Sequence, residues 1–165
     1  MLPPKLILAP VDFSDYSREA AQVAADLAAK FGCDLLLAYA VPALPSLPSA
    51  HEFFHEAEYE AGLRKEAERH LQALAQDLSQ KGVQVRTEIG VANDVGMEIL
   101  RIGEHNHADL IVIATHGMTG WHRLVFGSVA EKVVRLAACP VLVLRSQPKK
   151  EHEAPSKTSH SVATR

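Results

Sequence analysis

A loop rich in glycine offers the clearest place for ligand chemistry in this sequence. It reads ATHGMTGWHRLVFGS and carries Gly117, Gly120 and Gly127, followed by Ser128. Glycines let backbone amides approach a ligand closely because no Cβ intervenes. Where such a loop leads into a helix, the unpaired N–H groups and the helix dipole favour an anion. The spacing therefore predicts either a phosphate site or, alternatively, only a tight turn.

Ser128 and Glu131 have the S-x-x-E spacing of a capping box, in which both side chains satisfy backbone N–H groups at a helix start. We expect Ser128 to cap the last helix. The amides of Ser128 and Val129 would then point toward the anion together with the Ser128 hydroxyl.

Asp12 and Ser14 follow the first apolar run, in the segment PVDFSDYS. Ser14 is placed to cap the helix that comes next. Asp12 has two interpretations: its carboxylate accepts hydrogen bonds from a ribose or adenine, or it only satisfies amides of its own loop.

His51, Glu52 and His55 form the pattern H-E-x-x-H, which binds zinc on a helix of metalloproteases. Such a site needs a third ligand, for which Glu58 or Glu60 would be the candidate, and a cleft. The segment follows three prolines in an irregular connection. We interpret it as the solvated start of a helix and predict no metal site; the alternatives are adventitious surface binding of a divalent ion and a catalytic zinc.

Two common nucleotide motifs are absent from the sequence. No G-x-x-x-x-G-K-[ST] occurs, and no G-x-G-x-x-G follows a strand-like run. These absences argue against a P-loop NTPase and a dinucleotide oxidoreductase. Without a lysine on the phosphates, fast phosphoryl transfer lacks its usual charge neutralisation, and we predict no catalytic residue.

Apolar runs of strand length alternate with segments of helical period. The runs are 6–11, 34–41, 109–114 and 141–144, and an alternating run at 83–89 indicates a half-exposed or edge strand. The helical segments are 18–31, 57–81, 94–107 and 129–138. This order predicts an α/β fold, an open parallel five-stranded sheet with helices on both faces.

The long helical segment 57–81 is amphipathic. The apolar residues on its predicted buried face are Leu63, Ala67, Leu71, Leu74 and Leu78. Gly82 is the expected left-handed residue at its end.

The chain of 165 residues has the length of one domain, which we place at 1–145, followed by a polar tail at 146–165. The tail has almost no apolar residue to offset the entropy of ordering, so we expect it to be disordered. Three prolines make residues 42–50 an irregular connection.

Composition argues against several classes of partner. Seventeen Lys and Arg against 20 Asp and Glu give a net charge of −3, so no basic field would attract nucleic acid or a membrane surface. No apolar run approaches the roughly 20 residues that span a bilayer, and no export signal is visible. Cys33 and Cys139 form no C-x-x-C pair and indicate two buried thiols in a reducing cytoplasm.

Three segments together resemble the universal stress protein family: KLILAPVDFSDYSREA, ADLIVIATHGMTG and FGSVAEKVVRLAACPVLVLR. The resemblance covers residues 5–145 and implies a Rossmann-like sheet of order 3-2-1-4-5. It also implies a homodimer through the last strand, whose apolar edge invites pairing on physical grounds as well. Family members that bind ATP carry G-x-x-G-x9-G-[ST], for which this chain has Ala114, Gly117, Gly127 and Ser128.

The resemblance further implies an adenine-nucleotide site at the strand ends and the glycine-rich loop. The residues it assigns are Pro10 and Asp12 beside the adenosine, Ala40 at the adenine, Ile113 and Ala114 at the ribose, and Gly117, Gly127, Ser128 and Val129 at the phosphates. ATP, ADP or AMP would be the ligand, with or without Mg²⁺ or Mn²⁺.

The leading hypothesis is a cytoplasmic homodimer that binds ATP and acts in regulation or stress response, with an unidentified protein partner and without turning the nucleotide over. One alternative is a dimeric interaction protein of the same family, in which Ala114 and Met118 mark a lost site; Met118 stands where many relatives carry a basic residue. The other is a slow ATP hydrolase in which Asp12 orients a metal-bound water.

Overall fold

The computed structural model describes residues 3–43, 53–115 and 127–145, with only the course of the backbone between 53 and 60. Its strands are β1 (Leu6–Pro10), β2 (Asp34–Pro42), β3 (Val85–Ala92), β4 (Leu110–Ala114) and β5 (Val141–Leu144). Its helices are α1 (Asp15–Phe31), α2 (Phe53–Ser79), α3 (Val95–His105) and α4 (Ser128–Leu136). The strands form one parallel sheet in the order β3-β2-β1-β4-β5, which confirms the predicted fold class.

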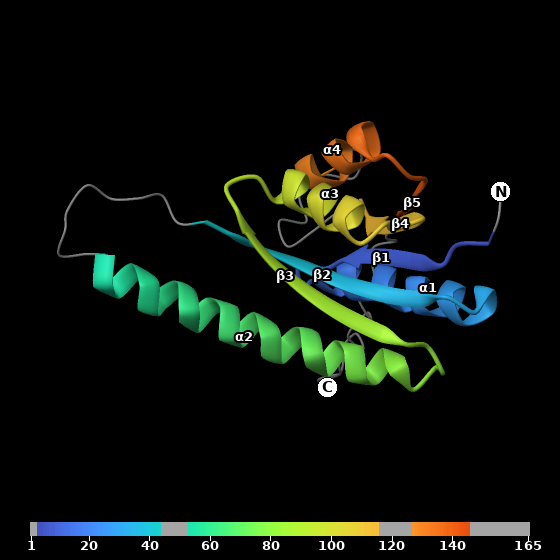
Figure 1. The fold of residues 1–165 in the computed structure, drawn as a ribbon, viewed down its shortest axis with the longest axis horizontal. Helices are drawn as coiled ribbons and strands as arrows, with labels where there is room; N and C mark the ends of the chain where they lie inside the picture. The colour runs from blue at the N-terminus through green and yellow to red at the C-terminus, as the bar shows by residue number, and fades with distance from the viewer. Residues whose placement is uncertain (1–2, 44–52, 116–126, 146–165) are drawn as a thin grey trace, which may run out of the picture.

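Helices cover both faces of this sheet (Figure 1). α1 and α2 pack on one face and α3 and α4 on the other, each pair with its own apolar cluster. On β1, Ile7 and Ala9 join the first cluster, whereas Leu6 and Leu8 join the second. Successive side chains of a strand point to opposite faces, so a strand covered on both sides requires a continuous apolar run.

Helix α1 lies close to the sheet because its buried side is built from alanines, among them Ala21, Ala24 and Ala28, all fully buried. Its start is fixed by Ser14, whose Oγ accepts a hydrogen bond from the backbone N of Ser17 at 3.2 Å. The predicted N-cap is thereby confirmed.

Helix α2 differs from expectation in its first half. Four of the five residues predicted to be buried on it are buried, but Leu63 is 38% exposed. The first turns of α2 reach past the ends of the strands, so the sheet does not extend far enough to cover that side chain (Figure 1). The helix ends at Ser79, and Gly82 has φ +78°, the left-handed conformation expected for it.

Several other expectations are refined by the structure. β3 begins two residues later than predicted and ends three residues later. It lies at one edge of the sheet, as expected.

Both cysteines are free thiols. Cys33 is buried, but Cys139 is only half-buried, because it lies in the bend before β5. No helix among the described residues is long and apolar enough to cross a membrane. Residues 146–165 lie outside the described residues.

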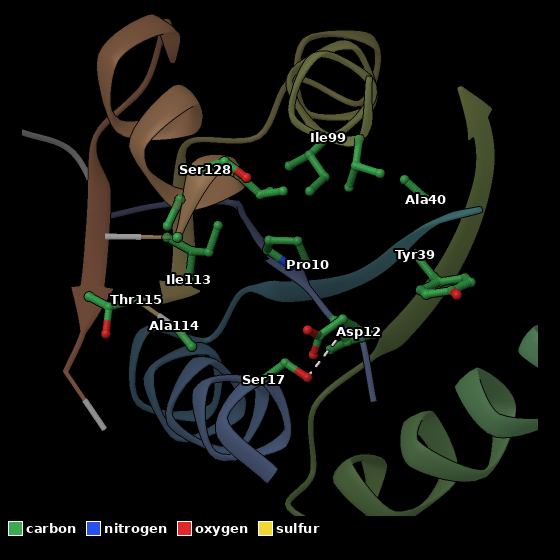
Figure 2. A pocket seen from close by; sticks show the side chains of 15 residues that line it. Pro10, Asp12, Ser17, Tyr39, Ala40, Ile99, Ile113, Ala114, Thr115 and Ser128 are labelled. Carbon is green, nitrogen blue, oxygen red and sulfur yellow. Dashed lines mark hydrogen bonds between the residues drawn. The ribbon is translucent and has the colours of Figure 1, made fainter. Parts of the chain in front are cut away.

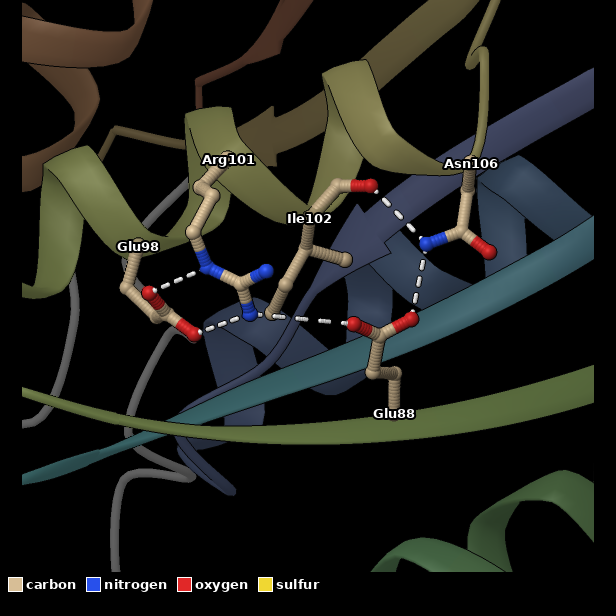
Figure 3. A network of polar contacts seen from close by, with 5 residues as sticks. All are labelled: Glu88, Glu98, Arg101, Ile102 and Asn106. Carbon is tan, nitrogen blue, oxygen red and sulfur yellow. Dashed lines mark hydrogen bonds and ion pairs between the residues drawn. The ribbon is translucent and has the colours of Figure 1, made fainter.

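Glu88 of the edge strand β3 is linked to α3 by Arg101 and by the C-cap residue Asn106 (Figure 3). Glu98 is 8% exposed and accepts two hydrogen bonds from Arg101, from Nε at 2.8 Å and from Nη2 at 2.6 Å. Arg101 lies 3.9 Å from Glu88 of β3, and Asn106 Nδ2 donates to Glu88 at 2.7 Å. Hydrogen bonding to Arg101 holds the pKa of Glu98 below its usual value, so the carboxylate stays charged although it lies against Gly90.

Gly90→Ala tests this arrangement. The new Cβ would lie 2.0 Å from Oε1 of Glu98 and 2.5 Å from its Cγ, so the side chain would have to leave its position. We expect the free energy of unfolding to fall by about 1–3 kcal/mol, as for other overpacked sites, measured by urea denaturation. The control is Gly62→Ala in α2, where a Cβ meets nothing within 4 Å and Ala should add about 0.5–1 kcal/mol. Unchanged stability of Gly90→Ala would show that Glu98 is not fixed there.

Candidate functional site

A cavity of about 310 Å³ lies at the carboxyl ends of β1, β2 and β4 (Figure 2). β1 stands between β2 and β4, and the order of the strands reverses there, since the chain crosses to one side for β2 and to the other for β4. Connections that leave in opposite directions open a crevice at this point, where open α/β sheets bind their ligands.

Eight of the nine residues assigned to the ligand from the sequence line this one cavity. They are Pro10, Asp12, Ala40, Ile113, Ala114, Gly127, Ser128 and Val129. Gly117, the ninth, lies outside the described residues, as do Met118 and the rest of the loop from 116 to 126. Segments that are far apart in the sequence therefore meet at one place.

Further residues of the cavity were missed by sequence reasoning: Val11, Ser17, Tyr39, Val95, Ile99, Thr115 and Ala130. Val95 and Ile99 lie one turn apart on α3, and Figure 2 shows Ile99 across the cavity from Asp12 and Ser17. Their apolar spacing predicts a buried helix face. The spacing does not predict where that face lies. The structure shows that the chain, on leaving β3, places this face of α3 at the ends of β1 and β4.

The carboxylate of Asp12 holds its own loop in place. Its Oδ1 accepts hydrogen bonds from the backbone N of Ser14 at 3.0 Å and from Ser14 Oγ at 2.6 Å. The backbone N of Asp12 donates to Ser17 Oγ at 3.2 Å, the contact dashed in Figure 2. The structure therefore contains the loop contacts that the second interpretation of Asp12 expects. A contact between Asp12 and a ligand would be additional to them.

Tyr39, which lines one end of the cavity, packs against a second aromatic ring. The rings of Phe13 and Tyr39 are 4.8 Å apart, and His70 of α2 meets Phe13 edge-on at 5.4 Å. Phe13 has φ +64°, unusual for a residue with a side chain, and Arg18 Nε donates to its carbonyl oxygen at 3.1 Å. Burial, followed by the charge of Asp12, raises the pKa of Tyr39, so its phenol stays protonated and is a hydrogen-bond donor.

The start of α4 forms the end of the cavity opposite Tyr39 in Figure 2. The predicted capping box is wrong: Gly127 is the N-cap residue, without a side-chain hydrogen bond, and Ser128 is the first residue of the helix, exposed. The reason is a contact between loops, because the N of Gly127 donates to the carbonyl oxygen of Thr115 at 2.8 Å and fixes Gly127 as the last non-helical residue. Within the described part of the chain, no side chain caps the start of α4, which lines the cavity.

The H-E-x-x-H pattern cannot be placed as a site. His51 and Glu52 lie outside the described residues, and so does the side chain of His55. Among the described residues, no group of three His, Cys, Asp or Glu side chains is arranged to hold a metal ion.

Comparison with known proteins decides the family. The model of the universal stress protein family matches residues 4–145. A universal stress protein of Methanocaldococcus jannaschii is 38% identical over 149 residues, 89% of this chain and 85% of the relative. The chain belongs to the universal stress protein family. This confirms the resemblance carried by the three segments of the sequence.

Solved structures of universal stress proteins share the fold. UspA from Lactobacillus plantarum has a TM-score of 0.75 at 26% identity, covering 86% of this chain and 97% of that one. A universal stress protein from Archaeoglobus fulgidus in complex with dAMP has a TM-score of 0.60 at 20% identity, covering 87% and 98%. At that identity the second likeness concerns the fold alone.

Ser14→Ala tests how the loop of Asp12 is held. The substitution removes the cap of α1 and one of the two hydrogen bonds to Asp12 Oδ1. We expect the free energy of unfolding to fall by about 1 kcal/mol, within the range of about 0.5–2 known for helix caps, measured by urea denaturation. Ser79→Ala is the control, since the Ser79 hydroxyl only donates to a carbonyl at an exposed helix end and its loss should cost less than about 0.5 kcal/mol. Equal effects of the two substitutions would contradict the assigned role.

Proposed function

We propose that this universal stress protein binds an adenine nucleotide in the cavity at the ends of β1, β2 and β4 and acts as a regulatory or stress-response factor in the cytoplasm. The observation that carries the proposal is that eight residues, assigned to the ligand from the sequence before the fold was described, all line that cavity. In this proposal the bound nucleotide itself is the regulatory signal, and the protein does not turn it over.

The chemistry of the cavity suits a nucleoside phosphate. About 310 Å³ falls in the usual range of small-molecule sites, and apolar side chains such as Ile99, Ile113 and Ala40 suit a base and a sugar. At the other end, the start of α4 offers backbone N–H groups and a positive dipole to phosphate oxygens. A universal stress protein of the same fold holds dAMP, an adenine nucleotide.

One departure from the ATP-binding pattern bears on affinity. Ala114 stands where ATP binders carry glycine, and its methyl group is already part of the cavity wall at 8% exposure.

Among the described residues that line the cavity, Asp12 carries the only carboxylate. One carboxylate together with phosphate oxygens matches the way Mg²⁺ is commonly bound, so we include Mg²⁺ or Mn²⁺ with a triphosphate in the proposal.

The direct experiment is nucleotide analysis of the purified protein. Denaturing it and examining the supernatant by mass spectrometry detects a carried nucleotide, and calorimetry with ATP, ADP and AMP tests the emptied site. Saturable binding supports the proposal, and no binding at millimolar nucleotide supports the interaction protein without a nucleotide. Release of phosphate from ATP in the presence of Mg²⁺ or Mn²⁺, abolished by Asp12→Ala, would instead support the hydrolase.

Ser128→Glu tests whether the phosphate of the nucleotide lies at the start of α4. Ser128 lines the cavity at the exposed first position of α4, where a carboxylate suits the helix dipole but repels a phosphate. We expect the affinity for AMP to fall about tenfold, equivalent to roughly 1.4 kcal/mol, with adenosine binding and thermal stability retained, as measured by calorimetry. Ser128→Gln is the matched neutral control. If the Glu and Gln variants bind AMP equally, phosphate does not lie at the start of α4.

A homodimer through β5 is part of the proposal. β5 is an edge of the sheet among the described residues, and its sequence VLVL carries no charge. The opposite edge, β3, carries Arg86 and Glu88, which protect an edge strand from pairing. An open apolar edge favours self-association, and Leu142 is 37% exposed on it.

Leu142→Glu should convert a dimer into a monomer, because a charge on β5 would be buried in the paired sheet. Light scattering after gel filtration measures the mass. Val91→Glu on β3 is the control, since Val91 is 46% exposed on the other edge and its substitution should leave the dimer intact. A Leu142→Glu variant that remains dimeric would place the interface elsewhere.

A further inference from the structure

An ion pair ties the two helices whose first turns border the cavity. Asp94 lies immediately before α3 and Lys132 in the second turn of α4, and Lys132 Nζ donates to Asp94 Oδ2. The other oxygen, Oδ1, accepts a hydrogen bond from the backbone N of Met97 at 3.2 Å and caps α3. A single carboxylate therefore fixes the start of α3 and joins it to α4.

The packing around this pair is close. The stem of Lys132 lies over Gly96, where an added Cβ would come within 2.9 Å of Lys132 Cδ. The hydrogen bonds from Lys132 and from the backbone N of Met97 lower the pKa of Asp94, so this carboxylate is ionised at neutral pH. Both partners are partly exposed, with side chains 43% and 31% accessible for Asp94 and Lys132.

The pair joins two walls of the cavity. Val95, the residue after Asp94, lines it from α3, and Ser128, one turn before Lys132 on the same side of the helix, lines it from α4. α3 is held independently, since Arg101 and Asn106 contact Glu88 of β3. α4 has only nine residues, with Ala130 and Val133 buried, so it is the element that depends more on the pair.

We propose that Asp94 and Lys132 are positioning residues that hold the first turn of α4 against α3 and so set the place of the helix start that receives the phosphate. Neither residue touches the ligand in this scheme. The proposal rests on the proposed nucleotide site and adds the residues that fix its phosphate end.

Two substitutions break the pair and leave the packing intact. Asp94→Asn keeps an acceptor for the Met97 amide, because Asn is as good an N-cap as Asp. Lys132→Met keeps an unbranched stem over Gly96. Lys132→Arg keeps both stem and charge and is the rescue variant. Lys81→Met is the matched control, because Lys81 pairs with Asp26 away from the cavity and its side chain is also 31% exposed.

Calorimetry with AMP and with adenosine gives the first measurement. We expect both pair-breaking variants to bind AMP about two- to fivefold more weakly, the scale of a partly exposed ion pair, with adenosine unaffected. The double variant should lose no more than either single one, because both remove the same interaction. Lys132→Arg and Lys81→Met should bind AMP as the unaltered protein does.

The second measurement is hydrogen exchange, without nucleotide, of the backbone amides at 131–134, which are the first to donate hydrogen bonds within α4, beginning with Glu131 to the carbonyl oxygen of Gly127. The pair-breaking variants should exchange faster there than Lys81→Met by about two- to fivefold, since the first turn of α4 opens more often. Exchange and AMP affinity equal to those of Lys81→Met would overturn the proposal. If the unaltered protein binds no nucleotide, the proposed function fails, and the exchange at 131–134 still shows whether the pair holds α4.

Discussion

Both faces of β1 are buried, and the arrangement of the remaining elements follows from that constraint. Ile7 and Leu8 are fully buried on opposite sides, so each side needs its own helices. The chain meets this need by placing β2 on one flank of β1 and β4 on the other, with crossovers over opposite faces. The strand ends diverge between those crossovers, and the cavity lies there.

The walls of the cavity are held by contacts that lie mostly outside it. The loop after β1 is fixed by hydrogen bonds between Asp12 and Ser14, and α3 is linked to Glu88 of β3 through Arg101 and Asn106. The link between Asp94 and Lys132 joins α3 to α4. The result is a pocket with an aromatic side chain, Tyr39, at one end and a helix start at the other, a distribution that suits a molecule with an apolar base and an anionic group.

Local sequence signals predicted those parts of the structure that depend on neighbours along the chain. The apolar runs gave the strands, since a doubly buried strand admits no polar residue, and Ser14 and Gly82 behave as their types predict. The failures involve distant contacts. Leu63 is exposed because α2 runs past the sheet, and Ser128 does not cap α4 because Thr115, twelve residues before Gly127, fixes the start of the helix.

The sequence by itself determined the order of strands and helices, because apolar periodicity is a local property, and its three motif segments carried the resemblance to the family. The residues that this resemblance implied include eight that line the cavity. Only the tertiary structure decided which side chains complete the cavity, Tyr39, Val95 and Ile99 among them, and which ion pairs hold its walls. These depend on how crossovers bring separate segments together. Residues such as Asp94 and Lys132 lie 38 positions apart, and no local pattern relates them.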